Sequence, residues 1–143
     1  MTTPPNAVHH SAEEGYTPAA ADHYVRGRPD YPPEVNAWLR ETLGLGPGAT
    51  VVDLGAGTGK FTRRLVETGS HVIAVEPVAA MRAKLAAALP EVDTRAGTAE
   101  SLPLDDASVD AVVCAQAFHW FANAASLADI LRVLKPGGRL GLI

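Results

Sequence analysis

The segment VVDLGAGTGK at residues 51–60 decides the fold of this 143-residue chain. It consists of a short apolar run, an aspartate at position 53, and glycines at positions 55, 57 and 59. Glycine allows a sharp backbone turn and the close approach of a ligand, and the first N–H groups of a helix have no partner within that helix. The segment therefore predicts a strand, a turn that touches a nucleotide, and a helix that begins near Gly59.

The spacing of the glycines separates two kinds of nucleotide site. The NAD-type fingerprint GxGxxG requires glycine where this chain has Lys60, and the pattern here is GxGxG. Asp53 lies two residues before the first glycine, where it would repel a pyrophosphate but stabilise an ammonium or sulfonium group. A cationic ligand end is therefore expected, and an NAD-dependent oxidoreductase is the less favoured alternative. We expect Lys60 itself to be a solvated helix residue.

From Asp53 to Gly59 the sequence resembles motif I of class I S-adenosylmethionine-dependent methyltransferases. Four further segments are similar to later parts of that family, namely its second strand with a terminal acid, its adenine-side loop, its fourth strand and its fifth strand: HVIAVEP (71–77), GTAESLPL (97–104), SVDAVVCAQAFHWF (108–121) and LKPGGRLGLI (134–143). The HWF triplet resembles the trans-aconitate methyltransferase-like subgroup of the methyltransferase type 11 domain. The resemblance implies S-adenosyl-L-methionine as cofactor and methyl transfer to a small-molecule acceptor.

The resemblance also implies which residues bind the cofactor. Glu76 lies about twenty residues past the first glycine and is expected to accept hydrogen bonds from both ribose hydroxyls. Thr98 occupies a position that is often acidic, so adenine recognition would fall to the backbone of Ala99 or Glu100; a solvated loop is the alternative. The full cofactor-binding set is Asp53, Gly55, Ala56, Gly57, Gly59, Glu76, Pro77, Thr98, Ala99, Glu100 and Gln116.

A second set of residues is expected at the methyl-transfer pocket or in a lid over it. The segment after the fourth strand and a Y…RPxYP element near the N-terminus supply this set: Tyr24, Arg28, Tyr31, Phe118, His119 and Trp120. His119 is the candidate catalytic base, because the pKa of histidine lies near neutrality; a packed histidine is the alternative. Arg28 could bind a carboxylate bidentately or be a solvated arm residue.

The alternation of elements predicts an α/β fold with a Rossmann-like, doubly wound parallel sheet. Residues 1–32 are expected to form an irregular arm, with a short helix near 18–24, and residues 33–143 the cofactor-binding domain. Apolar residues at helical spacing after Pro33 predict a first helix that stops at Gly44. The other elements predicted are strands at 50–54, 71–75, 92–96, 109–114 and 138–143 and helices at 59–68, 78–89 and 123–134. The resemblance implies the strand order 3-2-1-4-5.

The end of the chain differs from the family pattern. The family's sheet usually has seven strands, whereas this sequence stops at Ile143, within the expected fifth strand. We therefore expect a C-terminally truncated domain without the last two strands, and an exposed edge at strand five that could pair with another chain. The partner expected at this edge is a second copy of the chain, in a homo-oligomer. The alternative from a different functional class is a non-catalytic cofactor-binding or interaction module.

Composition narrows the classes of partner and location. A formal charge of −4 with scattered basic residues gives no footprint for nucleic acid or an anionic membrane. Cys114 is the single cysteine, and the N-terminus lacks a basic region followed by an apolar run, so a reducing cytoplasm is expected. No apolar stretch approaches the roughly 20 residues of a membrane span. His9 and His10 are adjacent, which does not suit tetrahedral ligation, so no metal is predicted.

Overall fold

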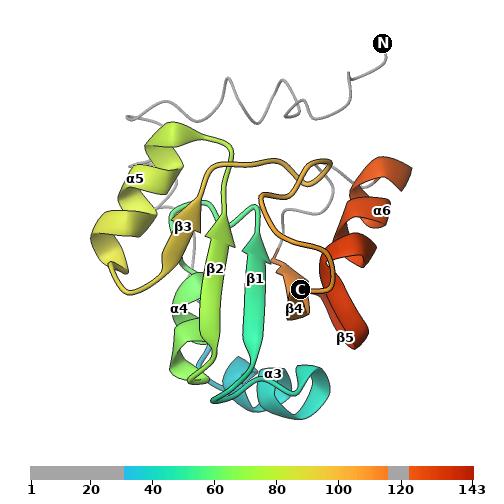
Figure 1. Ribbon diagram of the computed structural model, residues 1–143. Coiled ribbons are helices and arrows are strands. Elements are labelled where there is room, and N and C mark those ends of the chain that lie inside the picture. Colours follow the sequence, from blue (N-terminus) through green and yellow to red (C-terminus); the bar gives the residue numbers. More distant parts are fainter. Residues whose placement is uncertain (1–30, 116–122) are drawn as a thin grey trace.

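The computed structural model describes residues 31–115 and 123–143, which form a five-stranded parallel sheet flanked by helices (Figure 1). The strand order is β3-β2-β1-β4-β5, which confirms the predicted order and the Rossmann-like fold class. In chain order the elements are α3 (Val35–Leu43), β1 (Thr50–Leu54), α4 (Thr62–Glu67), β2 (His71–Val75), α5 (Ala79–Ala88), β3 (Asp93–Arg95), β4 (Val109–Cys114), α6 (Ala124–Val133) and β5 (Leu134–Leu142).

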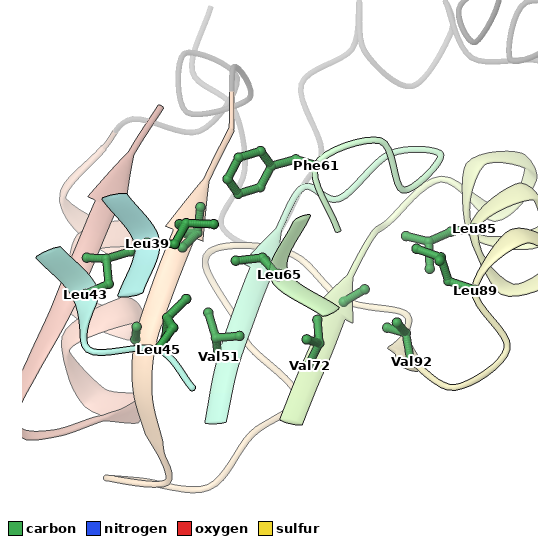
Figure 2. Packing of buried hydrophobic residues seen from close by; sticks show 13 residues of the cluster. Leu39, Leu43, Leu45, Val51, Phe61, Leu65, Val72, Leu85, Leu89 and Val92 are labelled. Carbon is green, nitrogen blue, oxygen red and sulfur yellow. The ribbon is translucent and has the colours of Figure 1, made fainter. Parts of the chain in front are cut away.

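The strands at the centre of the sheet are buried on both faces. Successive side chains of a strand point to opposite faces, and in β1 this sends Val51 into one core cluster and Val52 into the other. The first cluster joins the sheet to α3, α4 and α5, and Figure 2 shows Leu39, Leu65 and Leu85 among its members. The second cluster joins the opposite face to α6. Two buried faces explain why these strands are continuous apolar runs rather than alternating ones.

Two boundaries differ from the sequence-based prediction by more than one residue. The helix predicted at 59–68 begins only at Thr62. Gly59 has a non-helical φ angle of +96°, and its carbonyl oxygen accepts from the N–H of Arg63 at 3.1 Å, directly before the regular helix. The last strand begins at Leu134, which pairs with Val109 before the register shifts. Regular pairing then resumes at Arg139 against Ala111, so the predicted span 138–143 corresponds to the second part of β5.

The carboxyl ends of β1, β2 and β4 meet at one edge of the sheet, where ligands bind in open α/β folds. Among the described residues, β5 pairs with β4 alone and ends the strand order, and Leu142 on it is 53% exposed. None of the described helices is long and apolar enough to cross a membrane. The predicted helix near 18–24 and the adjacent histidines lie outside the described residues.

Candidate functional site

The turn after β1 is tied to the end of β2. The backbone N–H groups of Gly55 and Ala56 both donate to the carbonyl oxygen of Val75, at 2.9 and 3.3 Å. Gly55 and Gly57 have φ angles of +69° and +61°, in the left-handed region that other residues rarely adopt. Both glycines are therefore required by the path of the backbone, and the turn is held over the carboxyl edge of the sheet.

The third glycine of the motif serves the packing of a helix. A Cβ atom at Gly59 would lie 3.0 Å from Cγ of Leu85 and 3.3 Å from Cδ1 of Leu89, both in the α5 region of the core. The close approach that Gly59 permits in this structure is therefore to α5. Met81 is 2% exposed and Leu85 is fully buried, so both belong to the core.

Asp53 is a buried carboxyl group at the end of β1. It is 1% exposed, and the hydroxyl group of Thr62 donates a 2.6 Å hydrogen bond to Oδ2. Burial raises the pKa of Asp53 to about 7; the hydrogen bond from Thr62 opposes this rise, and the nearby charge of Glu76 adds to it. Asp53 can therefore change its charge near neutral pH.

Glu76 is a buried carboxyl group at the end of β2, and both of its oxygens have backbone donors. Oε1 accepts from the N–H of Gly57 at 2.9 Å, and Oε2 accepts from the N–H of Val78 at 2.8 Å. Burial raises the pKa of Glu76, whereas these two hydrogen bonds lower it. Because a carboxylate oxygen has two lone pairs, each oxygen retains capacity to accept from a ligand hydroxyl.

Arg82 supports the loop that carries Glu76. Its Nη1 atom donates to the carbonyl oxygens of Glu76 and Pro77, at 2.8 and 2.9 Å. The charge of Arg82 also lowers the pKa of Glu76. Sequence reasoning did not single out this arginine, because its hydrogen bonds go to backbone carbonyls and no motif marks it.

A pocket lies beside Asp53, between the carboxyl ends of β1 and β4. Its lining combines the glycine turn with an aromatic pair and the end of β4: Tyr31, Asp53, Gly55, Ala56, Thr58, Lys60, Phe61 and Ala115. The rings of Tyr31 and Phe61 meet edge to face, with centroids 4.8 Å apart. Tyr31, predicted as a lid residue, therefore lies at the pocket wall.

Four of the lining residues were not predicted to belong to the site: Thr58, Lys60, Phe61 and Ala115. Thr58 is 7% exposed, and its hydroxyl oxygen has no hydrogen-bond partner in the structure. Lys60 is half-buried and lines the pocket, so the prediction of a solvated helix residue is wrong. The physical reason is that the helix begins at Thr62, which leaves Lys60 in the turn. In the sequence, Thr58 lies between Gly57 and Gly59 and Lys60 follows Gly59, and this position could have indicated that both belong to the site.

The loop predicted to contact adenine is an ordered turn. Thr98 and Ser101 form an isolated antiparallel bridge, and Ala99 is 4% exposed within the second core cluster. The Oε1 atom of Glu100 accepts from Nδ2 of Asn123 at 2.9 Å. Because the side chain of Ala99 faces the core, Ala99 can meet a ligand only through its backbone. In Glu100, Oε1 bonds the start of α6, whereas Oε2 is buried without a hydrogen-bond partner among the described residues.

Six of the predicted site residues lie outside the part of the chain that the structure describes. Residues 1–30 and 116–122 lie outside the described part of the chain, and this excludes Tyr24, Arg28, Gln116, Phe118, His119 and Trp120. The roles predicted for them in the lid, the acceptor pocket and proton transfer stay predictions.

Comparison with known proteins identifies the family. A family model described as "Methyltransferase domain" matches residues 52–142, which is more than half of the chain. The chain belongs to the methyltransferase domain family. Together with the strand order, this confirms the predicted resemblance to class I methyltransferases. The narrower trans-aconitate methyltransferase-like subgroup stays a prediction.

Individual relatives of this methyltransferase-family chain agree with the assignment. An "Uncharacterized methyltransferase" of Mycobacterium tuberculosis is 54% identical over 125 residues, which are 87% of this chain and 50% of the relative. An "Uncharacterized methyltransferase" of Schizosaccharomyces pombe is 46% identical over 121 residues, 84% of this chain and 48% of the relative. The chain thus spans about half the length of the curated relatives it matches.

A solved structure shows that the fold extends beyond one activity. The [4+2]-cyclase SpnF superposes with a TM-score of 0.78 over 99% of this chain and 61% of its own, at 23% identity. At this identity the similarity concerns the fold alone. The fold of this methyltransferase-family chain therefore does not by itself determine the reaction.

Proposed function

We propose that the site binds S-adenosyl-L-methionine and that the protein transfers its methyl group to a small-molecule acceptor. The observation that carries the proposal is the pair of buried carboxyl groups, Asp53 and Glu76, at the carboxyl ends of neighbouring parallel strands. They flank a glycine turn whose Gly57 N–H binds Glu76 directly. Such an arrangement suits a ligand with hydroxyl groups at one end and positive charge at the other.

The residues present fit this cofactor. Glu76 would accept from the two ribose hydroxyls with the lone pairs that its backbone donors leave open. Asp53 would stabilise the cationic end when ionised, and Thr58 offers a buried hydroxyl group that has no partner. The backbone of Ala99 or Glu100 would meet the adenine ring. The family membership and the acidic strand ends support this placement over an NAD site.

For methyl transfer, the main task of the protein is to align the cofactor with the acceptor. The cofactor, when bound, supplies a methyl group on a sulfonium centre that is a good leaving group. The chain's residues would orient that centre and exclude water, which lowers the entropic cost of reaching the transition state. His119 would hold a proton of the acceptor if the acceptor needs a base.

Calorimetric titration tests the binding half of the proposal. We expect saturable binding of S-adenosyl-L-methionine at one site per chain and no binding of NADH at the same concentrations. Circular dichroism of the same sample checks that the chain is folded. Binding of NADH instead, or of neither ligand by a folded sample, would overturn the proposal.

The edge of the sheet favours a second, non-catalytic possibility. Strand β5 carries Leu142, which is 53% exposed, and Leu131 of the neighbouring α6 is 70% exposed. In the described part of the chain β5 pairs only with β4, and an unpaired strand edge is a template for pairing with another chain. We therefore propose a homo-oligomer through β5 as the alternative use of this surface. Light scattering would detect a concentration-dependent dimer. A monomer at all concentrations would exclude the homo-oligomer.

A cytoplasmic location likewise stays a prediction.

A further inference from the structure

The loop between β3 and β4 reaches α6 (Figure 1), and side chains of α6 bind its backbone. The N–H group of Leu102 donates to Oδ2 of Asp129 at 2.5 Å, and the carbonyl oxygen of Leu102 accepts from Nη2 of Arg132 at 3.0 Å. Nη1 of Arg132 also donates to the carbonyl oxygen of Leu104 at 2.8 Å. These hydrogen bonds fix the later part of the loop to α6.

Asn123 makes the link between α6 and the earlier part of the same loop. It is the N-cap residue of α6, where its Oδ1 atom accepts from the N–H group of Ser126 at 2.8 Å. Its Nδ2 atom donates to Oε1 of Glu100 at 2.9 Å. One end of the amide therefore binds the helix and the other end binds the loop, so a rotation of this side chain would break both hydrogen bonds.

The link reaches the part of the loop where the adenine ring is placed by the proposed function. Ala99 directly precedes Glu100 and has its side chain in the second core cluster. Among residues 31–115 and 123–143, the carboxyl group of Glu100 accepts a hydrogen bond from Asn123 alone, and its Oε2 atom is buried without a partner. Within the described part of the chain, the side chain of Glu100 is thus held by Asn123.

We propose that Asn123 is a positioning residue for base selectivity, because it holds through Glu100 the backbone that would meet the adenine ring. This inference rests on the proposed function, since it concerns how the same cofactor would be recognised. N1 of adenine accepts a hydrogen bond from a backbone N–H group, whereas N1 of hypoxanthine carries a hydrogen and repels it. A site built around a hydrogen bond rejects a ligand that cannot form it. The preference for adenine over hypoxanthine therefore reports the position of the loop.

Asn123→Asp separates the link to the loop from the cap of the helix. Aspartate caps a helix as well as asparagine does, and its charge suits a helix N-terminus. Its carboxylate, however, would repel Glu100 instead of donating to it. The double variant Asn123→Asp/Glu100→Gln re-forms the hydrogen bond in the reverse direction, because the glutamine amide can donate to the aspartate.

Calorimetry with S-adenosylhomocysteine and S-inosylhomocysteine, which differ only in the base, measures the selectivity. We expect the parent chain to bind the adenine ligand about tenfold or more tightly, the range of one hydrogen bond whose loss leaves a buried donor unpaired. Asn123→Asp should lower this ratio about threefold or more, and the double variant should restore it. A loss of stability alone would not change the ratio, because it affects both ligands equally.

Asn36→Asp is the matched control. Nδ2 of Asn36 donates to Oε1 of Glu67 at 3.0 Å, so the variant breaks the same kind of hydrogen bond between α3 and α4 and should leave the ratio unchanged. An unchanged ratio in folded Asn123→Asp, a double variant no more selective than the single one, or an equal fall in Asn36→Asp would overturn the role of Asn123.

The parent chain shows which of the two proposals fails. A folded parent chain that bound both ligands with equal affinity would overturn the base selectivity and leave cofactor binding in place. If the folded parent chain bound neither ligand, the proposed function would fail, and the role of Asn123 with it.

Discussion

The turn after β1 and the turn after β2 each present a buried carboxyl group, but they hold it in different ways. Glu76 accepts two backbone N–H groups, one from its own turn and one from Gly57 in the neighbouring turn. Within residues 31–115 and 123–143, Asp53 accepts from one side-chain hydroxyl, that of Thr62. The first arrangement joins two turns, whereas the second keeps a group whose charge changes near pH 7.

The comparison assigns the two acids different tasks. A carboxylate bonded to the backbone of two turns has a fixed position, which suits recognition of ribose hydroxyls. A carboxyl group with a pKa of about 7 is partly neutral at physiological pH, so its attraction for a cationic ligand depends on pH. The four substitutions below are arranged from the largest expected effect to the smallest.

Gly59→Ala tests whether the first turn is packed against α5. Gly59 has a φ angle of +96° and Leu85 Cγ lies 3.0 Å from the position of an added Cβ. Backbone strain and overpacking should together lower the free energy of unfolding by about 4 kcal/mol. Gly48→Ala is the matched control, since its φ angle is +90° and nothing lies within 4 Å. Urea denaturation measures both; equal losses would contradict the packing role.

Asp53→Asn tests the buried carboxyl group of the first turn. The folded-state pKa of about 7 lies above the ordinary value of 3.8, so folding favours the protonated form. That stabilisation is complete below about pH 4 and is lost as the pH rises through 7. Asparagine stays neutral, so the variant should be more stable than the parent by about 4 kcal/mol at pH 8 and equal to it at pH 4.

Denaturation at several pH values checks this prediction. Glu91→Gln, at an exposed position, is the control and should leave the pH profile unchanged. A parent chain and an Asp53→Asn variant with parallel profiles from pH 4 to pH 8 would show that Asp53 has an ordinary pKa, and the contrast between the two turns would disappear.

Glu76→Ala tests the link between the turns. The N–H groups of Gly57 and Val78 would lose their acceptors, while the cost of burying the carboxyl group would be relieved. The net loss should be about 2 kcal/mol in unfolding free energy, together with a cofactor affinity weaker by about 1.5–3 kcal/mol. Calorimetry of a folded sample measures the second effect. Unchanged affinity would remove the ribose assignment of Glu76.

Arg82→Met tests the turn after β2 alone, because the hydrogen bonds of Arg82 go to that turn. Two hydrogen bonds to the carbonyls of Glu76 and Pro77 would be lost at a half-buried site. Because these carbonyls can turn toward water, we expect a loss of about 1 kcal/mol in unfolding free energy. The variant should also raise the pKa of Glu76, which a carboxyl-carbon NMR titration would detect. An unchanged pKa of Glu76 in this variant would contradict the effect of the Arg82 charge on Glu76.

The sequence predicted the parallel sheet and the position of both acids, because the alternation of apolar runs and the glycine spacing are local signals. The strand order was predicted from the resemblance to the family. The sequence did not predict the hydrogen bond between Glu76 and Gly57, since that bond joins residues 19 apart in the chain. The sequence-based prediction also began the helix too early, at residue 59 instead of Thr62, and therefore assigned Lys60 to the helix. The packing of Gly59 against Leu85 depends on α5, which no local pattern around residue 59 reveals.

A backbone NMR titration tests the central claim most directly. With S-adenosylhomocysteine, the amide signals of Gly55, Gly57 and Val78 should shift together and saturate at one ligand per chain, because these groups belong to the two turns that hold the carboxyl groups. NADH should leave them unmoved. Saturable shifts elsewhere in the sheet, with these three amides unchanged, would contradict a cofactor site at the ends of β1 and β2.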